Sequence, residues 1–456
     1  MSPRPRSRRT ELFERSAQDD LLLMRNDLMT VYREHSAQDQ RLFPLRYARS
    51  APRRGARIPP EEAPPQVPAL IIPDGPGTAS VLPYHLLRST LGGHGLDVLM
   101  MEHRGVGLSR LDARGEDLPL SAMRVTEVVE DLRAVLDHAG VEQVAVLGSG
   151  YGAYLALALA ARHPQRVHSL VLDSPRTSAE DERISQAALR AAYWDGEDPH
   201  TARTAASLRR LIEGEEVDAQ RAGPIILAVH EHGGAESVQE LVRLLEVGRG
   251  HLTWNSVRQV LTQGWLESTP YVVEHDLVAP ISHTELGYGA SADGEPLDAL
   301  AITAQRARAV PPFAGEPWDL PVLAESITVP TIILSGTRDM ITPAVIAQDL
   351  ARRMPAAQLL SIPGAGHNLL DARSRIAQVA LRWSAAGIGQ RLPPLAPQLA
   401  RLPVSPADRS VSRGLHIALA AERLSPWRLA MESARERRDR ALVDPTARRT
   451  RTTRVR

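Results

Sequence analysis

Two residues in the second half of the chain could supply the acid and the base of a hydrolytic site. Asp339 follows an apolar run that ends at Leu334, and His367 follows one that ends at Ile362. A carboxylate that holds an imidazole in the right tautomer lets the imidazole take the proton of a hydroxyl nucleophile. Because open parallel sheets place their sites where the strands end, we expect Asp339 and His367 to lie together as catalytic residues.

The nucleophile of such a site is expected near Gly148-Ser149-Gly150-Tyr151-Gly152, which joins a short apolar run to an alanine-rich run. The pattern is typical of a nucleophile elbow, in which a strand turns sharply into a helix and the apex residue projects above the sheet. The residues two before and two after the apex must be small. Gly148 and Gly152 meet this requirement, so the sequence predicts Gly150 at the nucleophile position, without a reactive group.

Ser149 carries the one hydroxyl next to that apex and is a possible substitute nucleophile. If Ser149 were the apex, Leu147 and Tyr151 would flank it, and both are too bulky for the turn. Three hypotheses therefore stay open. The protein is an impaired or non-catalytic ligand binder, or it is an active hydrolase that uses Ser149 or a water activated by His367, or position 150 was changed in an otherwise active serine hydrolase.

A hydrolytic site of this kind also needs two backbone N–H groups directed at the developing negative charge. The sequence predicts one from Tyr151, just after the apex, and one from the Asp74-Gly75 turn, which follows the apolar run 69–72. The Asp74 carboxylate would oppose an oxyanion there unless it points away or is paired.

Strand and helix patterns alternate on both sides of a long helical stretch. Apolar runs predict strands over 69–72, 96–101, 141–147, 167–172, 329–334 and 358–362, and helices are expected over 151–162 and 374–383. This alternation predicts an α/β fold with a mainly parallel sheet covered by helices on both faces. The expected divisions are a basic arm, helix and Pro-rich connector (1–66), core (67–175), helical cap (176–325), core (326–390), and a Pro-rich linker, helix and basic tail (391–456).

Helices outside the core are expected near both ends of the chain. Leu21, Met24, Leu28 and Tyr32 recur at helical spacing, and Ser425 with Pro426 could begin a charged helix over 427–442.

The composition of the chain argues against several classes of function. The 456 residues contain 54 basic and 54 acidic residues, so overall charge favours neither nucleic acid nor membrane as a partner. No cysteine is present, which excludes disulfides and thiolate chemistry in this chain. No apolar stretch approaches the ~20 residues of a spanning helix. We expect a cytoplasmic protein without a metal site that binds a small molecule or a short peptide.

Four segments together resemble one family. Residues 73–77 resemble H-G-G-P-G, residues 102–109 resemble D-Q-R-G-x-G-x-S, and the elbow and the loops of Asp339 and His367 follow in the expected order. Over residues 67–385 the chain is similar to α/β-hydrolases of the prolyl aminopeptidase (proline iminopeptidase)-like serine peptidase group. The resemblance implies cofactor-free cleavage of an N-terminal residue from a peptide, or of small esters or amides, through an acyl-enzyme.

The chain departs from this family at positions that would take part in the reaction. Gly150 replaces the serine, Pro73 replaces the histidine, and Asp74 replaces a glycine of the oxyanion hole. The family grips a free amine with acidic cap residues, and the candidates Glu267, Glu274 and Glu285 cannot be assigned by motif.

Overall fold

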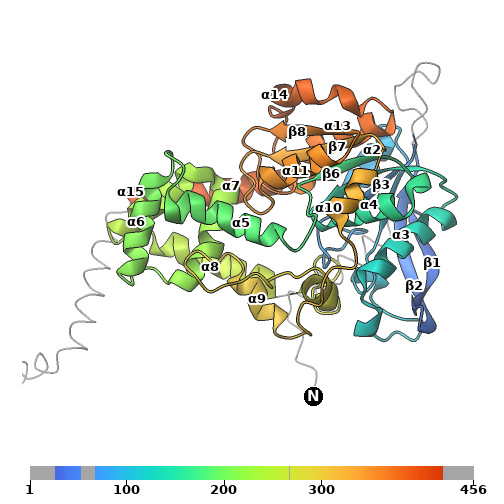
Figure 1. Cartoon of the computed structure of the whole chain (residues 1–456), viewed down its shortest axis with the longest axis horizontal. Coiled ribbons are helices and arrows are strands. Elements are labelled where there is room, and N and C mark those ends of the chain that lie inside the picture. The colour runs from blue at the N-terminus through green and yellow to red at the C-terminus, as the bar shows by residue number, and fades with distance from the viewer. Residues whose placement is uncertain (1–25, 53–66, 267, 425–456) are drawn as a thin grey trace, which may run out of the picture.

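The structure is a computed structural model that describes residues 26–52, 67–266 and 268–424 (Figure 1). One eight-stranded sheet forms its core, with the strand order β1-β2-β4-β3-β5-β6-β7-β8. The strands are β1 Leu28–Ser36, β2 Asp39–Ser50, β3 Ala69–Ile72, β4 Val98–Met101, β5 Val144–Ser149, β6 Val167–Asp173, β7 Thr331–Gly336 and β8 Ala357–Ile362. From β4 to β8 all neighbours pair in parallel, which confirms the predicted fold class.

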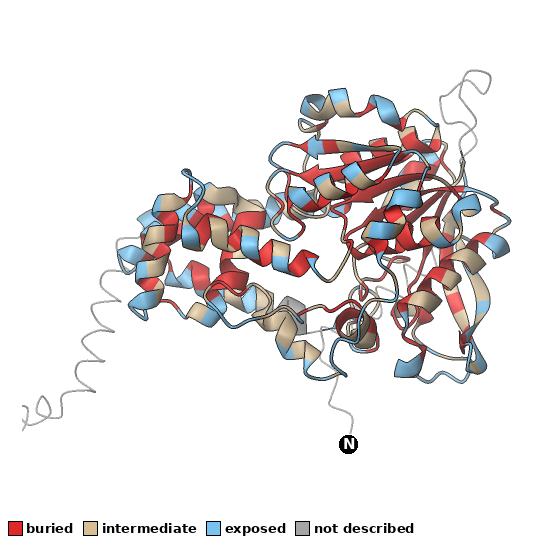
Figure 2. Ribbon diagram, in the orientation of Figure 1, coloured by how far each residue is buried: buried red, intermediate tan, exposed pale blue. Residues whose placement is uncertain are grey.

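Helices cover both faces of the sheet, as the strand compositions require. Every residue of β3, β4 and β5 is buried, because strands covered on both sides have no solvated face (Figure 2). Helices α3 Val125–His138, α4 Tyr151–Arg162 and α11 Ala344–Arg353 contribute to one apolar cluster, and α2 His85–Gly93 and α13 Ser374–Ala385 contribute to another. The predicted helices after the elbow and at 374–383 are confirmed.

The helix expected near the N-terminus is wrong where the structure describes it. Leu28 and Tyr32 lie in strand β1, which pairs antiparallel with β2, and Leu21 and Met24 lie outside the described residues. In β2, Phe43, Leu45 and Tyr47 are buried at every second position, as a strand packed on a core requires. This pairing overrides the helical spacing of β1, an edge strand in which most residues are partly buried or exposed.

A largely helical region lies between β6 and β7 and forms the predicted cap. It extends to one side of the sheet (Figure 1) and has an apolar cluster of its own. Its α-helices are α5 Asp181–Arg190, α6 Ala202–Glu213, α7 Ala219–Glu246, α8 His251–Leu266, α9 Ala301–Ala307 and α10 Leu320–Leu323. Helix α7 is kinked at Gly234, whose φ of 75° is left-handed.

The chain returns to the cap after the core is complete. Beyond α12 Leu369–Ala372, α13 and α14 Ala396–Leu399, helix α15 Pro406–Leu424 packs against α7 and α8. The Glu422 carboxylate accepts hydrogen bonds from the backbone N–H groups of Gly250 and Thr253 at the start of α8. The sequence analysis did not anticipate α15, and the helix expected over 427–442 lies outside the described residues. Across the described ranges, no helix combines the length and hydropathy needed to cross a bilayer.

Candidate functional site

The turn between β5 and α4 has the shape of an elbow with Gly150 at its apex. Gly150 adopts φ 51° and ψ −111°, between the last residue of the strand and the first of the helix. A Cβ on Gly148 would lie 2.2 Å from the carbonyl oxygen of Gly152, and one on Gly152 would lie 2.1 Å from that of Ile72. Backbone atoms therefore allow no side chain at either flanking position.

Ser149 faces a buried network instead of the space above the turn. Its hydroxyl donates to Asp173 Oδ2 at 2.8 Å and to Asn368 Oδ1 at 3.1 Å, and the residue is fully buried. Burial raises the pKa of Asp173 to about 6, against the hydrogen bonds from Leu370, Ser149 and Leu369. Ser149 thus helps to fix the strand β6 to the loop that carries the histidine.

Asp339 and His367 lie together as the sequence predicts. His367 Nδ1 is 3.1 Å from Asp339 Oδ2 and 3.3 Å from Oδ1. The N–H groups of Ile341 and Thr342 donate to Asp339 Oδ1, and the hydroxyl of Thr342 donates to Oδ2 at 2.9 Å. These hydrogen bonds fix the carboxylate, which in turn orients the imidazole with Nε2 pointing away from Asp339.

The Asp74 carboxylate occupies the place predicted for an oxyanion. Its Oδ1 accepts hydrogen bonds from the backbone N–H groups of Tyr151 and Gly75, both at 2.8 Å. Its Oδ2 lies 3.6 Å from His367 Nε2. A Cβ on Gly150 would lie 2.2 Å from Asp74 Oδ1, so the carboxylate takes up the space of a side chain at the apex. The sequence analysis left open whether Asp74 points away or is paired, and here it is paired.

The charges at the site shift the pKa values of Asp74 and His367 in opposite directions. Burial would raise the pKa of Asp74, but the hydrogen bond and charge of His367, with the two N–H donors, lower it. Burial would lower the pKa of His367, but Asp339 and Asp74 raise it well above its ordinary value. His367 therefore lies between two carboxyl groups, with Nδ1 3.1 Å from Asp339 Oδ2 and Nε2 3.6 Å from Asp74 Oδ2, and this placement favours the protonated imidazole.

This arrangement makes stability depend on pH in a defined direction. The pKa of His367 is higher in the folded protein than its value of 6.5 in the unfolded chain. The protonated imidazole therefore contributes its full stabilisation below pH 6.5, and this stabilisation is lost as the pH rises through the folded-state pKa. We expect the unfolding free energy of the wild type to fall toward that of His367→Gln as pH is raised above 6.5, measured by chemical unfolding between pH 6 and 9. A constant difference over this range would contradict the assignment.

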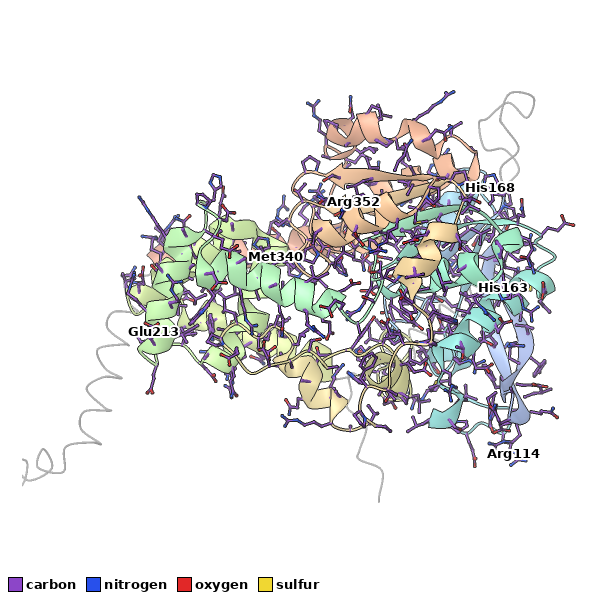
Figure 3. The ribbon with its side chains drawn as sticks, viewed as in Figure 1. Arg114, His163, His168, Glu213, Met340 and Arg352 are labelled. Atoms are coloured by element: carbon purple, nitrogen blue, oxygen red, sulfur yellow. The ribbon has the colours of Figure 1, made fainter. Side chains whose placement is uncertain are left out.

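A cap residue that the sequence analysis missed binds both the loop of Asp339 and the loop of His367. Glu231 on α7 is buried, and its Oε2 accepts the N–H of His367 at 2.8 Å while its Oε1 accepts the N–H of Met340 at 2.7 Å. Figure 3 labels Met340 beside the cap helices. Burial and the nearby Asp339 carboxylate raise the pKa of Glu231 to about 7. No local pattern marks this residue, since both of its partners lie more than 100 positions away in sequence.

Removing the Glu231 side chain is expected to destabilise the protein. Glu231→Ala leaves two partly buried backbone N–H groups without an acceptor. Partial burial places each at the lower end of the usual penalty, about 1–2 kcal/mol, so we expect a loss of about 2–4 kcal/mol in urea unfolding. Glu240→Ala on the same helix is the matched control, because Glu240 pairs with Arg243 at the surface and should cost about 1 kcal/mol or less. Equal losses in the two variants would show that Glu231 does not support the loops.

A cavity of about 830 Å³ opens above the site, between the core and the cap. Asp74, Gly150, Tyr151 and His367 line it from the core, and Ser149 is not among the described residues that line it. The cap side includes Arg176, Glu182, His275, His283, Tyr288 and Arg306. The space is large enough for a small organic molecule or a short peptide.

The acidic cap candidates have other partners. Glu274 Oε2 accepts the N–H of Gly107 at 3.0 Å, and Glu285 Oε2 accepts the N–H of Val125 at 2.6 Å. Glu267 lies outside the described residues. Within the part of the chain that the structure describes, no group of three or more acidic or histidine residues could hold a metal ion.

Two family models match the two parts of the core, and both matches extend into the cap region. The model described as alpha/beta hydrolase fold matches residues 68–209, and the model described as TAP-like protein matches residues 310–382. These matches cover the elbow, the acid and the histidine, and they agree with the sheet topology. The chain has the α/β-hydrolase fold.

Individual proteins that the chain resembles are distant. It is 30% identical to the Abhydrolase domain-containing protein lid-1 of Caenorhabditis elegans over 90 residues, which are 20% of the chain and 24% of that relative. Among solved structures, it is similar to a proline iminopeptidase from Mycobacterium smegmatis with a TM-score of 0.45 and 18% identity, over 78% of the chain and 97% of that structure. It is also similar to Est816, described as an N-acyl homoserine lactone degrading enzyme, with a TM-score of 0.40 and 18% identity, over 74% and 95% of the two chains.

Proposed function

We propose that this α/β-hydrolase binds a small molecule or short peptide in the cavity above His367 and does not carry out serine-dependent acyl transfer. The observation that carries the proposal is the position of the Asp74 carboxylate on the N–H groups of Tyr151 and Gly75. These donors would otherwise stabilise the oxyanion of an acyl transfer. The apex carries no hydroxyl, and the hole is filled with negative charge.

The two catalytic alternatives have less support. The Ser149 hydroxyl is buried against Asp173, so a distorted turn would be needed to bring it to His367. Direct activation of water by His367 requires a neutral imidazole, whereas Asp339 and Asp74 hold the pKa of His367 well above its ordinary value.

Two measurements on the purified wild type test this proposal. We expect no labelling by a fluorophosphonate probe and no hydrolysis of aminoacyl or short-chain ester substrates. In ligand screening by thermal unfolding, compounds that raise the melting temperature of the wild type should fail to do so for Ala228→Trp, which fills the cavity. Gln239→Trp, exposed on the same helix, is the matched control. Fluorophosphonate labelling of Ser149 would overturn the proposal.

A further inference from the structure

The carboxylates that line the cavity are bound by other groups of the protein. Those among the described lining residues are Asp74, Glu182, Glu231 and Asp276. Asp74 and Glu231 accept the backbone N–H groups described above. Glu182 Oε2 accepts the N–H of Gly289 at 2.9 Å. Arg110 donates to the two oxygens of Asp276 at 2.9 and 2.7 Å. A positively charged ligand would have to displace one of these donors, so this lining does not favour a cation.

Three basic side chains of the cap line the same cavity near one another. They are His275, His283 in the helical turn Pro280–Glu285, and Arg306 on α9. Burial and the charge of Arg306 lower the pKa of His275 to about 4, and the same two causes lower the pKa of His283. The charge of Arg306 therefore reaches both imidazoles. At pH 7 the two imidazoles are neutral, and Arg306 carries the positive charge of this group.

The Arg306 guanidinium has the chemistry to bind a negatively charged group. Burial lowers the pKa of Arg306 because desolvation disfavours its charged form, and an anion beside it would favour that form. A carboxylate can accept two parallel hydrogen bonds from a guanidinium, which also fixes its direction. The neutral rings of His275 and His283 add polar atoms without a competing charge. This part of the cavity therefore suits an organic anion.

Apolar side chains continue the lining from this basic part. Leu227 and Ala228 of α7 line the cavity with Ile302, which lies one turn before Arg306 on α9, and the two helices contact each other. We propose that the ligand is an organic carboxylate with an apolar body, whose carboxylate binds Arg306 while its body lies along α7 and α9. The inference deepens the proposed function and rests on it for the ligand's place in the cavity. Its charge preference is opposite to that of a cap that grips a free amine.

Three probes with one phenylalkyl body test the charge preference by titration calorimetry at pH 7. They are 4-phenylbutanoate, 4-phenylbutanamide and 4-phenylbutylamine, which are negative, neutral and positive at this pH. The wild type should bind 4-phenylbutanoate at least about 10-fold more tightly than either of the others, because hydrogen bonds between charged groups are the stronger ones. Arg306→Gln should weaken 4-phenylbutanoate at least about 10-fold and leave the amide within about 2-fold. Arg308→Gln, which is exposed on the same segment, is the matched control and should change neither affinity.

The comparison of the three probes on the wild type needs no variant, so it tests the inference even if Arg306→Gln does not fold. Arg306→Lys keeps the charge and should still bind 4-phenylbutanoate more tightly than the amide. The inference is overturned if the wild type does not bind 4-phenylbutanoate, if it binds the amide or the amine as tightly, or if Arg306→Gln does not weaken 4-phenylbutanoate.

Ala228→Trp separates this inference from the proposed function. Amide binding that equals that of 4-phenylbutanoate and that Ala228→Trp abolishes would leave the proposed function intact and refute the charge preference. Labelling of Ser149 by a fluorophosphonate would refute the proposed function without altering the comparison of the three probes.

Discussion

The double variant Gly150→Ser/Asp74→Gly is expected to react with a fluorophosphonate, whereas Gly150→Ser alone is not. A Cβ at position 150 would lie 2.2 Å from Asp74 Oδ1, and the Tyr151 and Gly75 N–H groups would still bind that carboxylate. Removing Asp74 frees both donors and brings the pKa of His367 closer to its ordinary value. Since one such donor is worth about 10²–10³ in rate, we expect labelling at least about 100-fold above the wild type.

The controls for this experiment identify the reacting residue. Asp74→Gly alone should remain unlabelled, because it opens the hole without adding a hydroxyl. Adding Ser149→Ala to the double variant should preserve labelling, since the buried Ser149 donates to Asp173. The serine at 150 adopts a φ near 51°, which costs about 1–3 kcal/mol, so folding is checked by thermal unfolding. Labelling of Gly150→Ser equal to that of the double variant would disprove the role assigned to Asp74.

Asp131→Ala is expected to cause the largest loss of stability. Arg104 is fully buried, and its Nε and Nη2 donate to Asp131 at 2.6 and 2.8 Å. Its Nη1 donates to the carbonyl oxygens of His35 and Ala122. Removing Asp131 takes away both hydrogen-bonded carboxylate oxygens of the buried guanidinium and leaves it the longer contact with Glu127, 3.8 Å from Nη2. It also removes the partner of Arg33 Nε, so we expect a cost of about 3–5 kcal/mol. Chemical unfolding at pH 7 measures this loss directly.

A second aspartate of α3 provides the matched control. Asp137 pairs with Arg133 and Arg166, but 46% of its side chain is exposed. Solvent screens these pairs, so Asp137→Ala should cost about 1 kcal/mol or less. If the two substitutions cost the same, the charge of Arg104 is compensated by its backbone acceptors and not by Asp131.

Tertiary contacts decided several features that local patterns could not reveal. Asp74 is 77 positions from Tyr151, and Glu231 is 136 positions from His367, so no local pattern reports either hydrogen bond. Strand β1 has helical spacing in sequence and became a strand through pairing with β2. Helix α15 follows a Pro-rich stretch and is stabilised by packing on the cap. In each case contacts with residues outside the segment itself supply the deciding free energy.

The sequence by itself determined the mainly parallel sheet, the glycine-flanked turn with Gly150 at its tip, and the proximity of Asp339 to His367. Periodic burial, the steric needs of a sharp turn and the ends of parallel strands are properties of short segments, so they can be inferred from the residues alone. Only the folded chain decided where the Asp74 carboxylate lies. Its position depends on N–H groups and an imidazole that three separate segments bring together, and their distances are fixed by packing across the sheet and the cap.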